Sequence, residues 1–322
     1  MAKSGSPSVR ARGFTLVEML VVVSIVAMLV SLLVPSLRAA REQAKLVKCQ
    51  SNMRQINVAL LTYLTEYDAL PIYYMKNDSG CIGGLCTWSY GGWLGVNPYW
   101  DERYSGVFKI PAYRRPLTAY LVKGEITPPV EVLNPGETRS KWKESGGQPV
   151  FQCPSDKVSA QWQWGYHTYE TAGVRLDYSA YDDVGTSYQM NYYWWYQTDK
   201  APGRDHDGDG VVEPLPGVCE KEEITTCNYP QLIDWPCRFR QGRQIWHKYT
   251  QHGSSRFVTL AEDPFDYAVV EMLQVIGFHG RFSRHNLAFL DGHVSYMKPD
   301  TRRMSGPHWT VVDEGMEAVP WP

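Results

Sequence analysis

The feature that most constrains this chain is an apolar run close to its start. Residues 14–34 read FTLVEMLVVVSIVAMLVSLLV and contain a single charged side chain, Glu18. A helix of this length spans about 30 Å, the hydrocarbon thickness of a bilayer. The leader before it, residues 1–13, contains three basic side chains and no acid. Because basic flanks stay in the cytoplasm, we predict one membrane-spanning helix, with the rest of the chain outside the cytoplasm.

Three simpler interpretations of the apolar run are a signal peptide cleaved after it, an uncleaved membrane anchor and a buried core helix. None of them explains Glu18. A carboxylate inside an apolar span costs a few kcal/mol on insertion scales, so such residues usually have a function.

The residues around Glu18 resemble the processing site of type IV prepilins. Basic residues precede Gly13 and Phe14, Glu18 is the fifth residue from Phe14, and Pro35 is the twenty-second. In that family a prepilin peptidase cuts between the Gly and the Phe, and the new N-terminus is methylated. The Glu and the Pro usually occupy these same positions of the mature chain. The resemblance implies that Gly13 and Phe14 form the cleavage site and that Glu18 and Pro35 serve assembly.

Physical chemistry supports a role for Glu18 in assembly. In a water-free bundle of helices, its carboxylate can be compensated by the positively charged N-terminus of a neighbouring subunit. That pairing would set the axial register of the subunits. Pro35 removes one backbone hydrogen bond and can kink or locally melt the helix.

An amphipathic stretch follows the apolar run. Apolar side chains recur at alternating spacings of three and four residues, which places them on one face of a helix. They are Leu46, Cys49, Met53, Ile56, Leu60, Tyr63 and Tyr67. Pro71 ends the pattern. We therefore predict one helix over 14–67, with its second half packed on a sheet and Cys49 as a buried thiol.

Beyond residue 70 the sequence favours strands and loops. The clearest hairpin has apolar runs at 286–290 and 293–297 around Asp291-Gly292, a pair that suits a type I′ turn with positive φ at both centres. The predicted fold is α+β, with a long N-terminal helix packed on an antiparallel sheet. The predicted organisation is a leader at 1–13, a helix at 14–67 and an extracytoplasmic globular domain at 68–322.

Several segments also resemble one large pilin-like subfamily. They are KCQSN at 48–52, CPSD at 153–156, SYQMN at 187–191 and a C-terminal segment that ends in FLDGHV at 289–294. The subfamily is named for a His, nine residues and Asp-Gly. This chain departs from that spacing, because five residues separate His285 from Asp291 and eleven separate His279 from it.

Six of the seven cysteines lie beyond residue 80, which fits disulfides in an oxidising compartment. The candidates are Cys81, Cys86, Cys153, Cys219, Cys227 and Cys237. Cys81 and Cys86 form the favoured local pair, and reduced buried thiols are the alternative. Cysteine metal sites are disfavoured because no CxxC spacing occurs.

The segment 205–213 has the D-x-D-x-D-G spacing of a calcium loop. Its oxygen donors would be Asp205, Asp207, Asp209, the Val211 carbonyl and Glu213. Pro216 stands where such a loop usually has a bidentate acid. A solvated acidic turn is the alternative to a Ca²⁺ site.

No catalytic motif or close pair of histidine ligands is recognisable, so we predict no enzyme. His285 and His293 are interpreted as exposed turn residues. The formal charge of -2 gives no reason to expect nucleic acid. Tryptophan and tyrosine clusters near 161–166 and 192–196 suit core packing, or alternatively a platform for stacking sugars.

The leading hypothesis is a structural subunit of a type IV pilus or of a type II secretion-like pseudopilus. Its expected partners are prepilin peptidase, the inner membrane and copies of itself or other pilins. It would pass the inner membrane once and then enter a periplasmic or extracellular filament. The alternative is a membrane- or filament-tethered binding module, such as a carbohydrate-binding adhesin.

Overall fold

A computed structural model describes residues 14–67, 71, 73–76, 82–93, 112, 115–122, 148–159, 179–191, 254–270, 274–303 and 305–311. The chain divides into two compact units, Met1–Ala44 and Lys45–Pro322. Each unit is considered by itself below.

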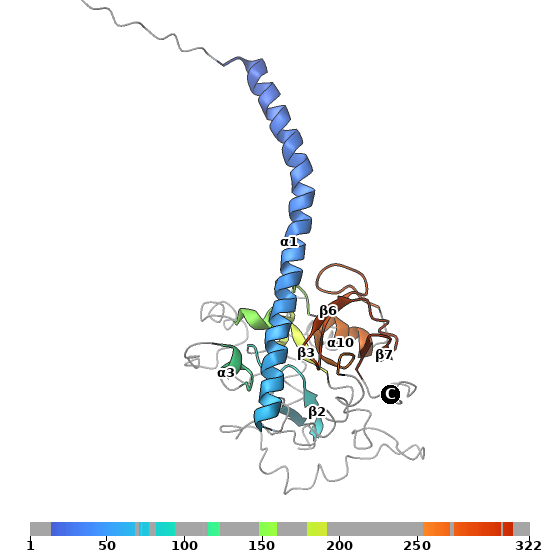
Figure 1. Ribbon diagram of the computed structural model, residues 1–322. Coiled ribbons are helices and arrows are strands. Elements are labelled where there is room, and N and C mark those ends of the chain that lie inside the picture. Colours follow the sequence, from blue (N-terminus) through green and yellow to red (C-terminus); the bar gives the residue numbers. More distant parts are fainter. Residues whose placement is uncertain are drawn as a thin grey trace, which may run out of the picture. The chain divides into compact units, whose positions relative to one another are not determined.

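The described residues begin with a long helix, α1, Leu16–Tyr67, which has 52 residues. It is continuous through Pro35, so this proline does not melt the helix (Figure 1). Both ends agree with the predicted range of 14–67 within two residues. Between Phe14 and Ala44 every residue is exposed within its unit.

The second half of α1 is amphipathic, as its apolar spacing predicts. Five of the seven stripe residues are buried, and the two end residues, Leu46 and Tyr67, are half-buried. The buried members are Cys49, Met53, Ile56, Leu60 and Tyr63. They join a core that includes Tyr188, Leu260 and Ala288 from the sheet.

The central sheet has four antiparallel strands in the order β3-β4-β5-β6. Their bounds are β3 Tyr188–Met190, β4 Val258–Glu262, β5 His285–Phe289 and β6 Val294–Met297. Two further strand pairs are β1 Tyr73–Lys76 with β2 Ile82–Cys86, and β7 Ser305–Gly306 with β8 Trp309–Thr310. The short helices are α3 Thr118–Leu121, η3 Pro149–Phe151, α6 Ala180–Val184 and α10 Asp263–Val270.

Both faces of the central sheet are covered. Leu260 and Ala288 pack in the core that contains α1, whereas Val258 and Leu287 pack in a second core with residues of α10 and β8. Strand alternation places Glu262, two residues after Leu260, on the α1 face. The predicted α+β fold, a long helix and an antiparallel sheet, is confirmed.

Two buried asparagines attach α1 to the rest of its unit. The Asn57 amide donates to the Phe289 carbonyl at 2.7 Å and accepts from the Thr259 hydroxyl at 2.7 Å. Asn52 donates to the backbone carbonyls at both ends of η3, those of Pro149 and Gln152, at 3.0 and 2.9 Å. Because both asparagines are fully buried, these hydrogen bonds fix the position of the helix on the sheet as well as stabilising it.

The β5–β6 hairpin is confirmed, but its predicted two-residue turn is wrong. The Phe289 amide donates to the His293 carbonyl, so three residues form the loop. Gly292 has φ +93, whereas Asp291 is not among the residues with positive φ. A three-residue loop of this kind needs the left-handed conformation at its last position alone, and glycine adopts it at little cost.

Candidate functional site

The start of α1 is closed by a capping box. The Thr15 hydroxyl accepts from the Glu18 amide at 3.2 Å, while the Glu18 carboxylate accepts from the Thr15 amide and hydroxyl, each at 2.8 Å. Such reciprocal bonds satisfy amide groups that a helix start leaves unpaired. Glu18 therefore has a local partner within a single chain. The T-x-x-E spacing of residues 15–18 is the sequence signal of such a capping box.

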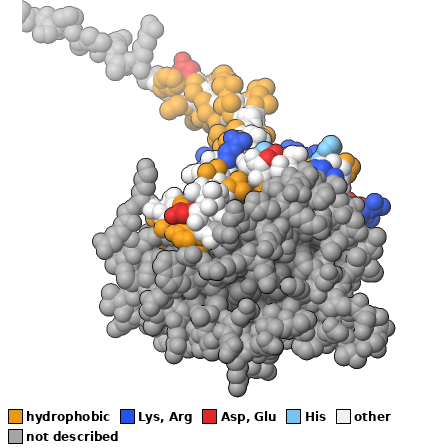
Figure 2. All heavy atoms as spheres, turned by 60° about the horizontal axis from the view of Figure 1, so that its bottom comes forward, with side chains coloured by type: hydrophobic (Ala, Val, Ile, Leu, Met, Phe, Trp, Pro, Cys, Tyr) orange, Lys and Arg blue, Asp and Glu red, His pale blue; other side chains and the backbone are white. Residues whose placement is uncertain are grey.

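The apolar run of α1 is exposed within its unit. Phe14 is 68% exposed and Leu16 is 80% exposed. An 18-residue window of α1 has a mean hydropathy of 2.8 and is 0% buried, so the helix is long and apolar enough to cross a membrane. Figure 2 shows hydrophobic side chains covering this part of the helix. An exposed apolar surface of this extent is typical of a segment that contacts lipid or another protein.

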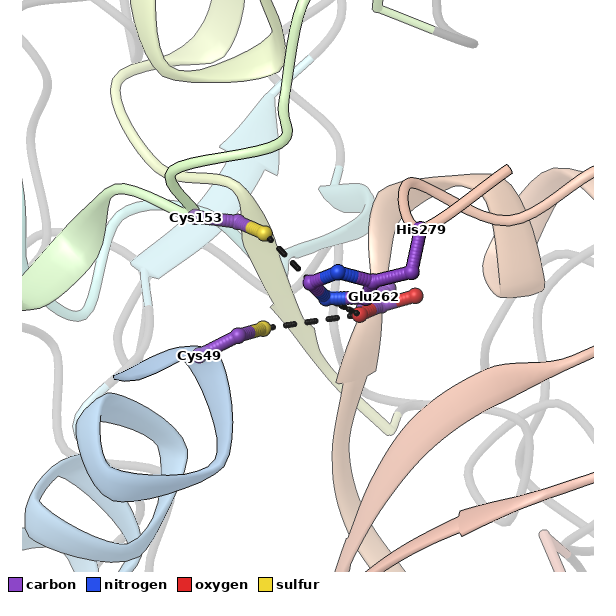
Figure 3. A group of neighbouring side chains, drawn as sticks. All are labelled: Cys49, Cys153, Glu262 and His279. Carbon is purple, nitrogen blue, oxygen red and sulfur yellow. Dashed lines mark hydrogen bonds and ion pairs between the residues drawn. The ribbon is translucent and has the colours of Figure 1, made fainter. Parts of the chain in front are cut away.

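A group of polar, metal-ligating side-chain types lies inside the unit Lys45–Pro322. Cys49 of α1, Cys153 after η3, Glu262 at the end of β4 and His279 before β5 point toward one another (Figure 3). Their ligand atoms all lie within 4.8 Å of one another. The side chains of Glu262 and His279 are 0% and 4% exposed, and both cysteines are buried.

The distances within this Cys-Cys-Glu-His cluster are short. Glu262 Oε1 lies 3.4 Å from Cys49 Sγ and 3.3 Å from His279 Nε2, and Cys153 Sγ lies 3.6 Å from His279 Nε2. Asn286 of β5 donates to Glu262 Oε1 at 2.6 Å and to Cys49 Sγ at 3.4 Å. The Tyr188 hydroxyl of β3 also donates to Cys49 Sγ, at 3.5 Å.

The cluster perturbs its own titratable groups. Burial raises the pKa of Cys49 well above its usual value. For Cys153, burial alone would raise the pKa, but hydrogen bonds with Cys49 and His279 lower it to about 7. For His279, burial alone would lower the pKa, but the contacts with Cys153 and Glu262 raise it to about 9. Without a bound ion, the raised pKa of His279 favours its protonated, positively charged form.

Two family comparisons match the chain. Residues 9–34 match the prokaryotic N-terminal methylation motif. Residues 38–225, more than half of the chain, match a family described as a protein of unknown function (DUF1559). The chain belongs to this family. The methylation motif spans Gly13, Phe14 and Glu18, so the resemblance to type IV pilin-like proteins is confirmed. No curated protein and no solved structure matches the chain significantly.

In this pilin-like chain, many predicted site residues lie outside the residues that the structure describes. These are Gly13, the calcium-loop residues 205–213, Cys81, Cys219, Cys227 and Cys237. Cys86 lies in β2, but its side chain is not described. Cys153 is a free buried thiol in the structure, and Cys49 is a buried thiol as predicted.

The interpretation of His285 as an exposed turn residue is wrong. Its side chain is fully buried, and burial lowers its pKa to about 4. The reason is that residue 285 begins β5, where its ring packs against the Phe265 ring of α10, with the two ring centroids 5.7 Å apart. His293 does lie beside the turn, where it stacks on Phe289 and bonds to Asp291.

The Cys-Cys-Glu-His cluster was missed from the sequence because its members are far apart. Cys49 and Cys153 belong to the KCQSN and CPSD segments, but no spacing connects them with Glu262 or His279. One signal was available. Glu262 ends the apolar strand VTLAE at a position where alternation places a core residue.

Proposed function

We propose that this chain is a structural subunit of a type IV pilus or of a type II secretion-like pseudopilus. Prepilin peptidase would cut between Gly13 and Phe14, and residues 14–34 would first hold the subunit in the inner membrane. The same helix would then enter the core of a filament. One observation supports this proposal above the others: an exposed apolar helix begins immediately after the cleavage position of a matched methylation motif.

In the proposed filament, Glu18 gains a second partner. Its carboxylate caps its own helix in the single chain. In a subunit bundle it would also meet the freed, methylated amine of a neighbouring Phe14, which compensates a buried negative charge. The capping role needs an acceptor oxygen, which glutamine also has. The registry role needs the negative charge.

Two substitutions separate these roles. Glu18→Gln keeps the capping acceptor and removes the charge, whereas Glu18→Val removes both. We expect both variants to insert in the membrane and to be nearly absent from filaments sheared off the cells. Glu42→Gln, at an exposed acid of the same helix outside the apolar run, is the matched control and should assemble normally.

The measurement is the amount of each variant in sheared filaments relative to membranes, by immunoblot and electron microscopy. If Glu18→Gln assembles normally and Glu18→Val does not, Glu18 acts as a cap and the registry mechanism is wrong. If the wild-type chain is never found in filaments, the proposal of a filament subunit is wrong and the alternative, a membrane-tethered binding module, is favoured.

A further inference from the structure

We propose that Cys49, Cys153, Glu262 and His279 bind a divalent transition-metal ion, Zn²⁺ by its donor set. The site lies within one unit of the chain and does not depend on filament assembly. Two sulfurs, one imidazole nitrogen and one carboxylate oxygen are all established zinc donors.

The spacing of the donors fits a tetrahedral ion. Zinc bonds of about 2.3 Å to sulfur and about 2.0–2.2 Å to nitrogen or oxygen, at tetrahedral angles, separate neighbouring donors by about 3.3–3.8 Å. The observed separations are 3.4 Å between Cys49 Sγ and Glu262 Oε1, 3.6 Å between Cys153 Sγ and His279 Nε2, and 3.3 Å between His279 Nε2 and Glu262 Oε1. These three separations match a tetrahedral ion, and all four donor atoms lie within 4.8 Å of one another, so small shifts of the side chains would bring them to bonding distance of one ion.

The surroundings of the cluster favour anionic ligands. Tyr188 and Asn286 donate hydrogen bonds to Cys49 Sγ, and Asn286 also donates to Glu262 Oε1. Donors of this kind orient metal ligands and stabilise their ionised forms. The second carboxylate oxygen, Glu262 Oε2, is buried and has no hydrogen-bond partner among the described residues. A buried carboxylate oxygen without a hydrogen-bond donor is a favourable neighbour for a cation, and a bound Zn²⁺ would place one there.

A Cys49–Cys153 disulfide is the competing outcome. It would join the same two segments but would leave Glu262 and His279 as a separate buried pair. The four-donor arrangement and the polar groups aimed at it are unnecessary for a disulfide, so we favour the metal.

Four protein ligands would leave no open position for a substrate, which is typical of a structural zinc site. The ion would tie α1 to the segment after η3, to β4 and to the loop before β5. These parts of the sequence are otherwise connected to α1 by packing and by hydrogen bonds such as those of Asn52 and Asn57.

The first test is the metal content of the full-length chain. It is purified in detergent without a histidine tag, reductant or added metal, and analysed by inductively coupled plasma mass spectrometry. We expect about one zinc ion per chain, and a more than tenfold loss in a Cys49→Ser/Cys153→Ser double variant. His293→Gln changes a histidine outside the cluster and should keep the wild-type content.

A second test keeps all four ligands, and its first part uses the wild-type chain and therefore does not depend on the folding of a variant. In the wild-type chain, Cys49 and Cys153 should react with an alkylating reagent only after a zinc chelator is added, as located by peptide mass spectrometry. Asn286→Ala should weaken zinc binding by roughly 10- to 100-fold in competition with a chelating dye. A metal-free wild-type chain, a Cys49–Cys153 disulfide, or alkylation that is the same with and without chelator would overturn the proposal.

Discussion

At the scale of single residues, buried polar side chains define how α1 meets its domain. Asn52, Asn57 and Glu262 are each fully buried at the interface between the helix and the rest of the unit. A purely apolar stripe could slide along the sheet, because hydrophobic contact is not directional. The hydrogen bonds from Asn52 and Asn57 to particular carbonyls, and from the Cys49 thiol to Glu262, leave one position for the helix.

Asn57 allows a direct test of this role. Asn57→Ala would remove two buried hydrogen bonds, to the Phe289 carbonyl and from the Thr259 hydroxyl, each of which contributes about 0.5–1.5 kcal/mol. The two groups keep their other partners, the Gly292 amide and the Ala288 carbonyl. We expect the full-length chain in detergent to melt several degrees lower, as followed by circular dichroism. Gln55→Ala, at an exposed position of the same helix whose side chain bonds only within α1, should change the melting temperature little. Equal melting of the two variants would contradict the account.

At the scale of elements, α1 and the β5–β6 hairpin were predictable because their information is local. The helix follows from a 3.6-residue periodicity, and the hairpin from two apolar runs around Asp291-Gly292. The turn type was not predictable from that pair. The loop length depends on which backbone amide closes the hairpin, here that of Phe289, and the Asp-Gly pair does not determine this. The central strand β4 was not predicted. All five of its residues are buried, so buried and exposed positions do not alternate along it as they do in a strand with one exposed face.

The calcium loop is an element that the described residues do not include, and we propose it on its spacing alone. Three aspartates at 205, 207 and 209 repel one another unless a cation screens them. At a calcium concentration ten times Kd, binding to the folded form alone adds about 1.4 kcal/mol of stability. The full-length chain should therefore melt a few degrees higher with millimolar calcium than without it.

Asp207→Asn/Asp209→Asn should remove the calcium effect and slightly raise the calcium-free melting temperature, because fewer like charges then repel one another. Magnesium is the control ion, because it suits a flexible loop of carboxylates poorly. If the wild-type chain melts at the same temperature with and without calcium, the segment is a solvated acidic turn.

At the scale of the whole molecule, the sequence predicted the fold class and the N-terminal machinery but not the buried cluster. Residues 13, 14, 18 and 35 lie close together along the chain, so their spacing alone identifies them. The cluster joins positions 49, 153, 262 and 279, and only the completed sheet and helix bring these together. A site made by tertiary contacts gives no spacing motif, and in a single sequence its residues look like ordinary core or surface positions.

The central claim is that this chain is made as a prepilin, cut before its apolar helix and methylated. The most direct measurement is intact and peptide mass spectrometry of the protein taken from the membranes and sheared filaments of the cells that make it. The account predicts a chain that begins at a methylated Phe14, with the leader 1–13 absent. A chain that retains its leader, or one cleaved after the apolar run near Ala39, would contradict it.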